Sequence, residues 1–302
     1  MTEHSGVVVL GSLNMDIVLS VERIPGPGET LLAREMDTYP GGKGLNQAVA
    51  VARANAPCTM IGFLGADDFG RSLRDVLETE RIENSRVLEI KGQTGQAFIT
   101  VSQSAENSIV VVSGANINPS SLTERDLESI ASARVLLAQL EIPISRVSQA
   151  ARFARSKGST VVLNAAPATE LDDDLLSNLD FLIVNEHEAS IIAKENDLPK
   201  AMQKLAGKVD NLIVTLGKLG SVVFSNAIEL FRTPAFEVKA VDTTGAGDTF
   251  CGAFVAAISK GETIQFAVRY ATAASALAVT KQGAVPSIPT EAEVEEFLAA
   301  RL

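Results

Sequence analysis

The stretch Asp242-Thr243-Thr244-Gly245-Ala246-Gly247-Asp248 leads directly into an apolar run with helical character. An extended segment at 236–241 precedes it, so the glycines are predicted to lie at a strand-to-helix turn. Such a turn directs free backbone N–H groups and the positive end of a helix at one point, which suits an anion. Asp248 would stand beside that anion, where it makes sense as the base that takes a proton from an attacking hydroxyl. The stretch favours phosphoryl transfer, with Asp248 as base and Gly245, Ala246 and Gly247 as the anion cradle.

Two other interpretations of this stretch compete with phosphoryl transfer. In the first, it is an ordinary tight turn in which Asp248 caps the helix. In the second, it is a dinucleotide-binding fingerprint, but Phe250 occupies the third glycine position and the motif lies late in the chain. For the isolated motif the first alternative stays open. A second glycine cluster, far upstream, favours phosphoryl transfer.

That second cluster is Gly41-Gly42-Lys43-Gly44-Leu45-Asn46, and it opens a predicted helix. It is not a P-loop, because Lys43 is followed by Gly44 rather than Ser or Thr and the earlier glycine is missing. Its glycines allow the backbone to come close to a ligand, and Asn46 offers both a donor and an acceptor to a hydroxyl group.

Two short polar side chains, Asn14 and Asp16, follow a predicted buried strand at Val7–Leu10. They would project from the carboxyl end of that strand, where open α/β sheets bind ligands. As isolated residues they would more often form turns. Together with the glycine cluster at 41–46, they are interpreted as a clamp for sugar hydroxyls.

Short apolar runs alternate with amphipathic stretches along the whole chain. Strands are predicted at Val7–Leu10, Thr59–Leu64, Val135–Gln139, Thr160–Asn164, Phe181–Asn185, Asn211–Leu216 and Ser221–Phe224. Helices are predicted, among others, at Ser72–Thr79, Ile144–Lys157 and Glu188–Glu195. The alternation predicts an α/β fold, with a doubly wound, mainly parallel sheet flanked by helices in a single domain over residues 1–302.

Two regions, at approximately 14–40 and 95–113, break this alternation and predict a small inserted β-sheet. The first contains the strand-like run Ile17-Val18-Leu19. The second fits a hairpin, Ala97–Val101 and Ile109–Val112, that turns at 104–107. Such insertions are candidates for a lid, because closing over a sugar would exclude the water that competes as acceptor.

The composition argues against several classes of partner. With 37 acidic and 26 basic residues the net charge is −11, which disfavours nucleic acid and anionic membranes. No apolar run reaches the roughly 20 residues that a membrane span needs, and the start at 1–4 lacks the features of a signal peptide. Cys58 and Cys251 show no metal-type spacing and fit a reducing compartment, so we expect a cytoplasmic protein.

In combination, these motifs make the chain similar to the ribokinase family of sugar kinases, also called the ribokinase/PfkB carbohydrate kinases. The similarity runs over nearly the whole chain. Its motifs stand in order at 11–16, 41–46, 139–141 (Gln-Leu-Glu), 185–188 (Asn-Glu-His-Glu), 215–220 (Thr-Leu-Gly-Lys-Leu-Gly) and 242–248. The resemblance implies that the single domain is a kinase domain. It also implies ATP-dependent phosphorylation of D-ribose at its primary 5-hydroxyl, which gives ribose 5-phosphate and ADP.

The resemblance also implies a sugar site around the predicted clamp. Its residues would be Asn14, Met15, Asp16, Gly42, Lys43, Gly44, Asn46, Glu141 and Asp248. Carboxylates and amides suit a neutral polyol and disfavour a sugar phosphate or sugar acid, which would want a guanidinium clamp. Ribose is preferred over deoxyribose or fructose only through the resemblance. Adenosine is less favoured, because Tyr39 and Phe98 are the only plausible stacking partners in the lid.

The implied nucleotide site combines a magnesium motif with a glycine-rich turn. Asn185 and Glu188, one helical turn apart, would hold Mg²⁺ through water, although Asn-x-x-Glu alone is a common helix cap. The residues implied for ATP are Asn185, Thr215, Leu216, Gly217, Lys218, Leu219, Gly220, Gly247 and Thr272. Lys218 could equally reach a phosphate or point to solvent.

Two further features follow from the resemblance alone. The first is a potassium site behind the glycine turn, formed by Asp242, Thr244, Ala278, Lys281, Gly283 and Ser287. Its alternative is that Asp242 simply caps its own turn. The second is a homodimer in which the lid clasps its partner and buries Phe98, Ile109 and Val111. The alternative is a hairpin that only covers the site.

The chain departs from the family pattern at three positions. Leu45 replaces a smaller residue, which concerns the sugar fit, and Ala165 stands where proline is usual. Thr272 occupies a position near the expected adenine pocket that often carries His or Asn, which concerns nucleotide preference. A function of a different class, a catalytically silent sugar-binding regulator, is less favoured because Asp248 and the turn at 245–247 are present.

Overall fold

A computed structural model describes residues 4–104 and 106–301, which form two β-sheets and ten α-helices over that range. The strands are β1 (Val7–Leu10), β2 (Asn14–Ser20), β3 (Glu35–Gly41), β4 (Cys58–Gly65), β5 (Glu83–Ile90), β6 (Gly95–Val101), β7 (Asn107–Val112), β8 (Val135–Ala138), β9 (Thr160–Asn164), β10 (Phe181–Asn185), β11 (Asn211–Thr215), β12 (Ser221–Ser225) and β13 (Ile228–Thr233). The helices are α1 (Lys43–Arg53), α2 (Asp68–Thr79), α3 (Glu124–Ser132), α4 (Ile144–Lys157), α5 (Asp173–Ser177), α6 (Glu186–Ala193), α7 (Leu198–Ala206), α8 (Ala246–Ser259), α9 (Ile264–Ala278) and α10 (Glu291–Ala299).

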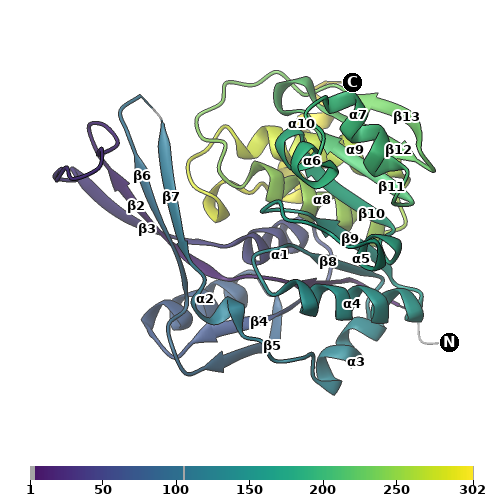
Figure 1. Ribbon diagram of the computed structural model, residues 1–302, viewed down its shortest axis with the longest axis horizontal. Coiled ribbons are helices and arrows are strands. Elements are labelled where there is room, and N and C mark those ends of the chain that lie inside the picture. The colour runs from purple at the N-terminus through teal and green to yellow at the C-terminus, as the bar shows by residue number, and fades with distance from the viewer. Residues whose placement is uncertain (1–3, 105, 302) are drawn as a thin grey trace.

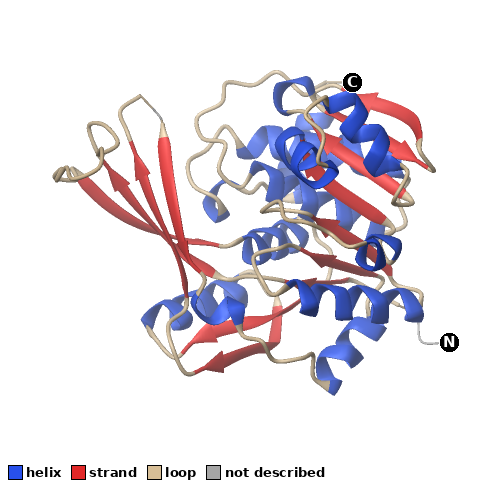
Figure 2. Ribbon diagram, in the orientation of Figure 1, coloured by secondary structure: helices blue, strands red, loops and turns tan. Residues whose placement is uncertain are grey.

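The larger sheet has nine strands in the order β13-β12-β11-β10-β9-β8-β1-β4-β5, and all its pairs are parallel except β11–β12 and β12–β13. Successive side chains of β1 enter two different hydrophobic cores, with Val7 and Val9 in one and Val8 and Leu10 in the other. Residues of α1, α2, α8, α9 and α10 fill the first core, and residues of α3 to α7 fill the second. The sheet therefore carries helices on both faces, as Figures 1 and 2 show, and the predicted doubly wound, mainly parallel sheet is confirmed.

All seven predicted strands are present, with ends within one residue of those expected. The expected strand before the glycine turn is wrong, because residues 234–240 carry no strand and the turn at 245–247 follows an irregular segment. The large sheet already ends at β13. The N–H groups of Val241 and Asp242 donate to the carbonyl of Val279, just beyond α9, instead of to a neighbouring strand. The half-apolar pattern of this segment comes from packing, such as the edge-on contact of Phe236 with Phe297 at 5.3 Å.

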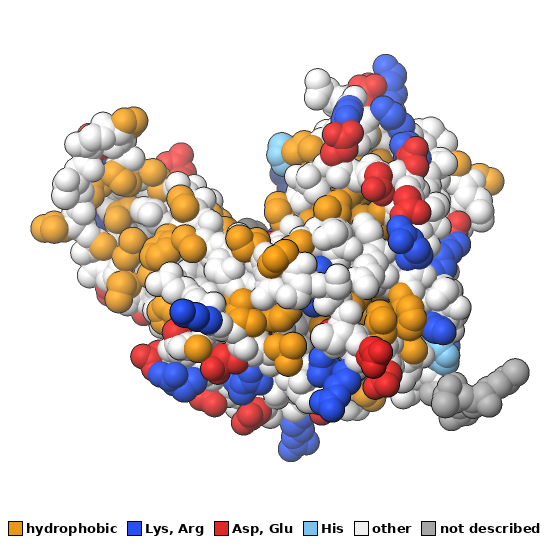
Figure 3. Space-filling view, turned by 60° about the horizontal axis from the view of Figure 1, so that its bottom comes forward, with side chains coloured by type: hydrophobic (Ala, Val, Ile, Leu, Met, Phe, Trp, Pro, Cys, Tyr) orange, Lys and Arg blue, Asp and Glu red, His pale blue; other side chains and the backbone are white. Residues whose placement is uncertain are grey.

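The smaller sheet has the order β3-β2-β6-β7 and projects from the body of the molecule (Figure 1). It is built from the two regions that break the alternation, and the predicted hairpin is β6 with β7; residue 105 of its turn lies outside the described residues. All six residues of β7 are exposed. Its four apolar residues alternate between the two faces of the sheet, so both faces carry exposed hydrophobic side chains, and the sheet lies across a broad hollow from the helical body (Figure 3).

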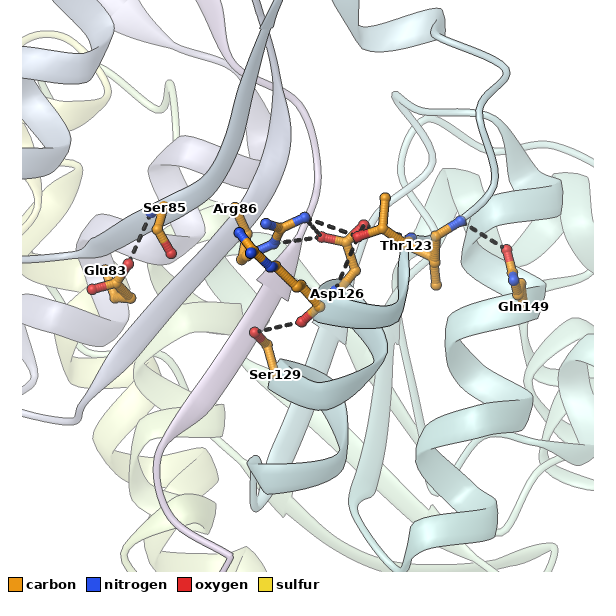
Figure 4. Close-up of polar contacts among 9 residues, drawn as sticks. Glu83, Ser85, Arg86, Thr123, Asp126, Ser129 and Gln149 are labelled. Atoms are coloured by element: carbon orange, nitrogen blue, oxygen red, sulfur yellow. Dashed lines mark hydrogen bonds and ion pairs between the residues drawn. The ribbon is translucent and has the colours of Figure 1, made fainter.

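A buried ion pair connects the chain segments before and after the β6–β7 hairpin, the second insertion (Figure 4). Arg86 on β5 donates from Nε to Oδ1 of Asp126 at 2.9 Å. Oδ2 of Asp126 accepts from the backbone N and Oγ1 of Thr123, the N-cap of α3, each at 2.8 Å. Because β5 precedes β6 and α3 follows β7, this contact fixes both ends of the insertion to the body. Within the described residues, no helix is long and apolar enough to cross a bilayer.

Candidate functional site

The N-terminus of α8 forms one wall of the site. Gly245 is its N-cap, with a φ of 72° that a side-chain-bearing residue rarely adopts. A Cβ atom added to Gly247 would meet no atom within 4 Å, so this part of the turn faces open space. Asp248, in the first turn, is only 7% exposed. The N–H of Ala246 donates to the carbonyl of Thr243 at 3.3 Å, which closes the turn.

A cavity of about 1030 Å³ opens in front of this turn. It is lined by seven of the predicted nucleotide residues: Asn185, Thr215, Gly217, Lys218, Gly220, Gly247 and Thr272. Leu216 and Leu219 are not among its lining residues, because Leu216 packs in the core and Leu219 is 69% exposed on the surface. Sequence reasoning missed the apolar part of the lining, which includes Phe236, Val238 and Phe250, because such residues look like ordinary core positions.

The predicted sugar residues gather around the N-terminal end of α1. Asn14 pairs with Gly41 across β2 and β3, and a Cβ on Gly41 would lie 2.2 Å from Oδ2 of Asp16. Glu141 accepts from the backbone N–H of Lys43 at 3.1 Å. Gly42 has a φ of 87°, and Gly44 packs so closely on the backbone at 11–12 that a Cβ would clash. The side chain of Met15 differs, because it alternates to the opposite face and packs in the core.

One hydrogen bond joins the two glycine clusters. Asn46, in the first turn of α1, donates from Nδ2 to Oδ2 of Asp248 at 3.0 Å, across 202 positions of sequence. The Oδ1 atom of Asn46 is buried and has no partner among the described residues. A buried carbonyl oxygen without a partner is costly, so this atom marks a place where a ligand hydroxyl can donate.

The charges at this point are concentrated. Burial, followed by the charges of Glu141 and Asp248, raises the pKa of Asp16 to about 7, and Lys43 opposes that rise. Conversely, the pKa of Lys43 is raised, chiefly by Asp248 and further by Glu141 and Glu188, although burial acts in the opposite direction. The charges of four carboxylates, those of Asp16, Glu141, Glu188 and Asp248, therefore interact with one ammonium group.

Two further polar residues complete the sugar side and were missed by sequence reasoning. Ser12 donates from Oγ to Oε2 of Glu141 at 2.5 Å and accepts from the N–H of Gly44 at 3.2 Å. Asn116, in a short 3-10 turn after β7, donates from Nδ2 to Oδ1 of Asn14 at 2.7 Å. The Ser12 signal was present in the 11–16 motif, whereas nothing in the sequence pairs Asn116 with a residue 102 positions earlier.

Asn185 and Glu188 form a reciprocal capping box at the start of α6, with two hydrogen bonds of 2.8 Å. The pKa of Glu188 is raised, mainly by burial and in part by Asp248, while the bond from Asn185 and the charge of Lys43 oppose the rise. Within the described residues, no group of three or more His, Cys, Asp or Glu side chains is arranged to hold a metal directly. Asn185 and Glu188 therefore cap α6, which is the alternative that the sequence left open for this motif.

Asp242 connects the two segments predicted for a potassium ion. Its Oδ1 accepts from N and Oγ1 of Thr244, at 2.9 and 2.7 Å, and its Oδ2 accepts from the N–H of Gly283 at 2.9 Å. Burial alone would raise the pKa of Asp242, but these hydrogen bonds bring it below its usual value. Lys281 is turned toward Glu293, 2.9 Å away, so its charge is matched there. Asp242 therefore caps its own turn and also places oxygen atoms near residue 283.

The remaining predicted positions are also placed. The carbonyl of Ala278 accepts from the N–H of Lys281 at 3.1 Å, and the hydroxyl of Ser287 donates to the carbonyl of Ala284 at 2.8 Å. Leu45 is fully buried in the core, so its departure from the family pattern lies away from the sugar side. Ala165 is likewise fully buried.

Comparison with known proteins identifies the family. The description "pfkB family carbohydrate kinase" matches residues 4–291. The chain belongs to the pfkB family of carbohydrate kinases. Ribokinase from Haemophilus influenzae is 42% identical over 300 residues, which cover 97% of this chain and 98% of that protein. Ribokinase from Bacillus subtilis is 38% identical over 296 residues, with coverages of 97% and 99%.

A solved structure supports the same relationship. Arabidopsis thaliana ribokinase complexed with ribose and ATP is similar to this chain with a TM-score of 0.91 and 33% identity. The match covers 97% of this chain and 98% of that one. This pfkB kinase therefore has the ribokinase-like fold that its motifs predicted.

Proposed function

We propose that this pfkB kinase transfers the γ-phosphoryl group of ATP to the 5-hydroxyl of D-ribose, giving ribose 5-phosphate and ADP. The observation that carries the proposal is the hydrogen bond between Asn46 and Asp248. It brings the sugar-side cluster of α1 and the anion-binding turn of α8 to one point, beside a cavity large enough for a nucleotide. The relatives with near-full coverage are named ribokinases, which supports ribose as the acceptor.

The sugar is held by hydroxyl contacts. Asn14, Asp16 and Glu141 supply carboxylate and amide oxygens, and the buried Oδ1 of Asn46 supplies an acceptor. The glycines at 42 and 44 let the start of α1 pack directly on the backbone at 11–14, which brings these side chains together. Anionic sugars would be repelled by these carboxylates, so a neutral polyol is the class of acceptor that fits.

Asp248 takes the proton from the attacking hydroxyl as that oxygen bonds to the γ-phosphorus. The N–H groups at the N-terminus of α8 receive the negative charge that develops on the transferred group. Closure of the smaller sheet, acting as a lid over the sugar, excludes water as a competing acceptor. Residues 1–302 would then act as one kinase domain, with lid segments at approximately 14–40 and 95–113.

ATP occupies the cavity, with its base against the apolar side chains of Phe236 and Val238 and its phosphates toward Gly247. Asn185 and Glu188 would hold Mg²⁺ through water, and Asp242, Thr244 and nearby carbonyls would offer oxygens to K⁺. When bound, Mg²⁺ neutralises phosphate charge and K⁺ steadies the turn at 245–247.

The exposed face of the smaller sheet suits a homodimer. Ile109 and Val111, which the pairing with β6 places on one face of the sheet, are 53% and 48% exposed although they are apolar, whereas Phe98, 38% exposed, lies on the other face. We assign the face that carries Ile109 and Val111 to a second copy of the chain in the cytoplasm, where the two free, buried cysteines need no oxidising environment. Sedimentation of the protein and of Ile109→Asp tests the dimer, and a wild-type monomer at micromolar concentration would refute it.

The function is tested by coupled ADP release with Mg·ATP and D-ribose, 2-deoxyribose, fructose or adenosine, with and without potassium. We expect ribose-dependent turnover that potassium increases. If only another sugar is phosphorylated, the proposed phosphoryl transfer stands and that sugar replaces ribose as the acceptor. Ribose binding by calorimetry without turnover on any acceptor would refute the kinase assignment and favour a catalytically silent sugar-binding protein. Turnover that does not depend on potassium would refute the potassium site.

A further inference from the structure

A chain of buried amide side chains ends on Asp248. Gln47 donates from Nε2 to Oδ1 of Asp248 at 2.9 Å and to Oδ1 of Asn164 at 3.0 Å. Gln139 donates from Nε2 to Oε1 of Gln47 at 2.6 Å. Gln47 and Gln139 are both 0% exposed, so neither is free to touch a sugar or a nucleotide.

The direction of this chain is determined by chemistry. An ionised carboxylate only accepts hydrogen bonds, so Gln47 must turn its NH₂ group toward Asp248. Both hydrogens of that group are then used, one by Asp248 and one by Asn164. The oxygen of Gln47 consequently faces the other way, where the NH₂ group of Gln139 meets it. Reversing any amide would leave two donors or two acceptors face to face.

The members of the chain stand on rigid elements. Gln47 is on α1 and Asp248 on α8, while Gln139 directly follows β8 and Asn164 ends β9, at the centre of the large sheet. Asn164 is itself held by a bond from Nδ2 to the carbonyl of Ile183 at 3.3 Å. One oxygen of Asp248 is thus fixed to the core.

The second oxygen of Asp248 has a different environment. Its partner is Nδ2 of Asn46, whose other side-chain atom has no partner among the described residues. Asn46 can exchange this bond for contacts with a sugar, whereas Gln47 is held by Gln139 and Asn164 as well. The two oxygens of the same carboxylate are therefore not equivalent.

We propose that Gln47, oriented by Gln139, is a positioning residue that anchors Asp248 through Oδ1 and leaves Oδ2 to receive the proton of the sugar hydroxyl. This rests on the proposed function, in which Asp248 is the base. The electron pair of the sugar O–H bond forms the new bond to the γ-phosphorus, the proton moves to Oδ2, and ADP leaves with the electrons of the broken P–O bond.

A double-mutant cycle tests the anchor. Gln47→Met keeps the side-chain length but removes the donor, and we expect kcat to fall about 10–100-fold with the ribose Kd unchanged within about threefold. In the Asp248→Asn background the same change should cost nothing further, because the group it positions is already lost. Gln139→Met, which leaves Gln47 in place, should show the same pattern with a smaller loss of kcat. If Gln47→Met does not fold, Gln139→Met replaces it in the double-mutant cycle.

A control variant separates positioning from stability. Ser159→Ala removes a buried hydroxyl that donates to the carbonyl of Ala133 at 2.8 Å. Ser159 lies at the amino end of β9, the opposite end from Asn164. It should lower Tm while kcat stays at the wild-type value. An equal loss of kcat from Gln47→Met in both backgrounds, or no loss in the wild-type background, would overturn the proposal.

A second measurement does not depend on turnover. In side-chain ¹⁵N spectra, the Gln47 NH₂ pair, assigned by its absence in Gln47→Met, should exchange slowly with solvent and shift in Asp248→Ala. If the wild-type protein phosphorylates no acceptor, the proposed function fails, yet this spectrum still decides the anchor. A Gln47 pair that is unaffected by Asp248→Ala would overturn it.

Discussion

Asp126 and Asp248 are both almost completely buried, at 2% and 7% exposure, but their partners differ in kind. Asp126 pairs with the guanidinium of Arg86 and also accepts two hydrogen bonds from Thr123 (Figure 4). Among the described residues, Asp248 receives hydrogen bonds only from the neutral amides of Asn46 and Gln47.

The difference separates a carboxylate that holds the fold together from one that can do chemistry. The guanidinium of Arg86 balances the charge of Asp126 through a direct ion pair, which suits a structural role. Neutral amides orient Asp248 without cancelling its charge, which is met only through space by Lys43, whose pKa Asp248 raises more than any other group does. A carboxylate that is buried and oriented without a direct ion pair has the geometry that a general base needs.

The largest effect on turnover should come from removing the charge of Asp248. Asp248→Asn keeps the shape and should lower kcat about 10²–10⁴-fold, because a base contributes about that much to a proton transfer. The ribose Kd should change little, and Tm should fall less than in Asp126→Asn, since Lys43 keeps the nearby charges of Glu141 and Glu188. Steady-state kinetics, calorimetry and thermal unfolding measure the three quantities. Near-normal turnover would show that Asp248 is not the base.

The matched change at Asp126 should lower stability and leave kcat nearly unchanged. Asp126→Asn leaves the guanidinium of Arg86 buried without its counter-charge, so the free energy of unfolding should fall by about 3–5 kcal/mol. Urea unfolding measures this loss, and kcat per folded molecule should stay within about twofold of wild type. The double variant Arg86→Met/Asp126→Leu should regain most of the stability. A stable Asp126→Asn with low kcat would break the comparison.

The sequence predicted the Asp248 region better than the Asp126 region, for physical reasons. Glycines beside Asp248 and Asn46 carry backbone requirements that are visible in a linear motif, and the strands at 7–10 and 160–164 are marked by continuous apolar runs. The pairing of Arg86 with Asp126 is a contact across 40 positions between ordinary surface residue types, and no local pattern indicates it. The contacts of Gln47 with Gln139 and of Asn116 with Asn14 escaped prediction in the same way, since each depends on how distant elements pack.

A third carboxylate, Asp16, lies between these two extremes and gives the smallest predicted effect. Its folded pKa of about 7, against 3.8 for the free side chain, follows first from burial and then from Glu141 and Asp248. Below pH 7 it becomes protonated and loses the charge that accepts sugar hydroxyls. The ribose Kd should therefore rise about tenfold between pH 8 and pH 6, as calorimetry across this range would show. In Asp16→Asn the ribose Kd should be high and independent of pH.

The same pKa has a consequence for stability with a determined sign. Because the folded pKa of Asp16 is raised, its stabilising contribution is fully present below about pH 3.8 and is lost as the pH rises through about 7. Asp16→Asn carries no such charge, so its Tm should gain on that of the wild type as the pH rises from 4 to 8. If the two Tm curves stay parallel, the pKa of Asp16 is not raised in the folded protein as its surroundings indicate. Asp16 would then resemble Asp126, a carboxylate whose charge is balanced by its neighbours in the folded protein.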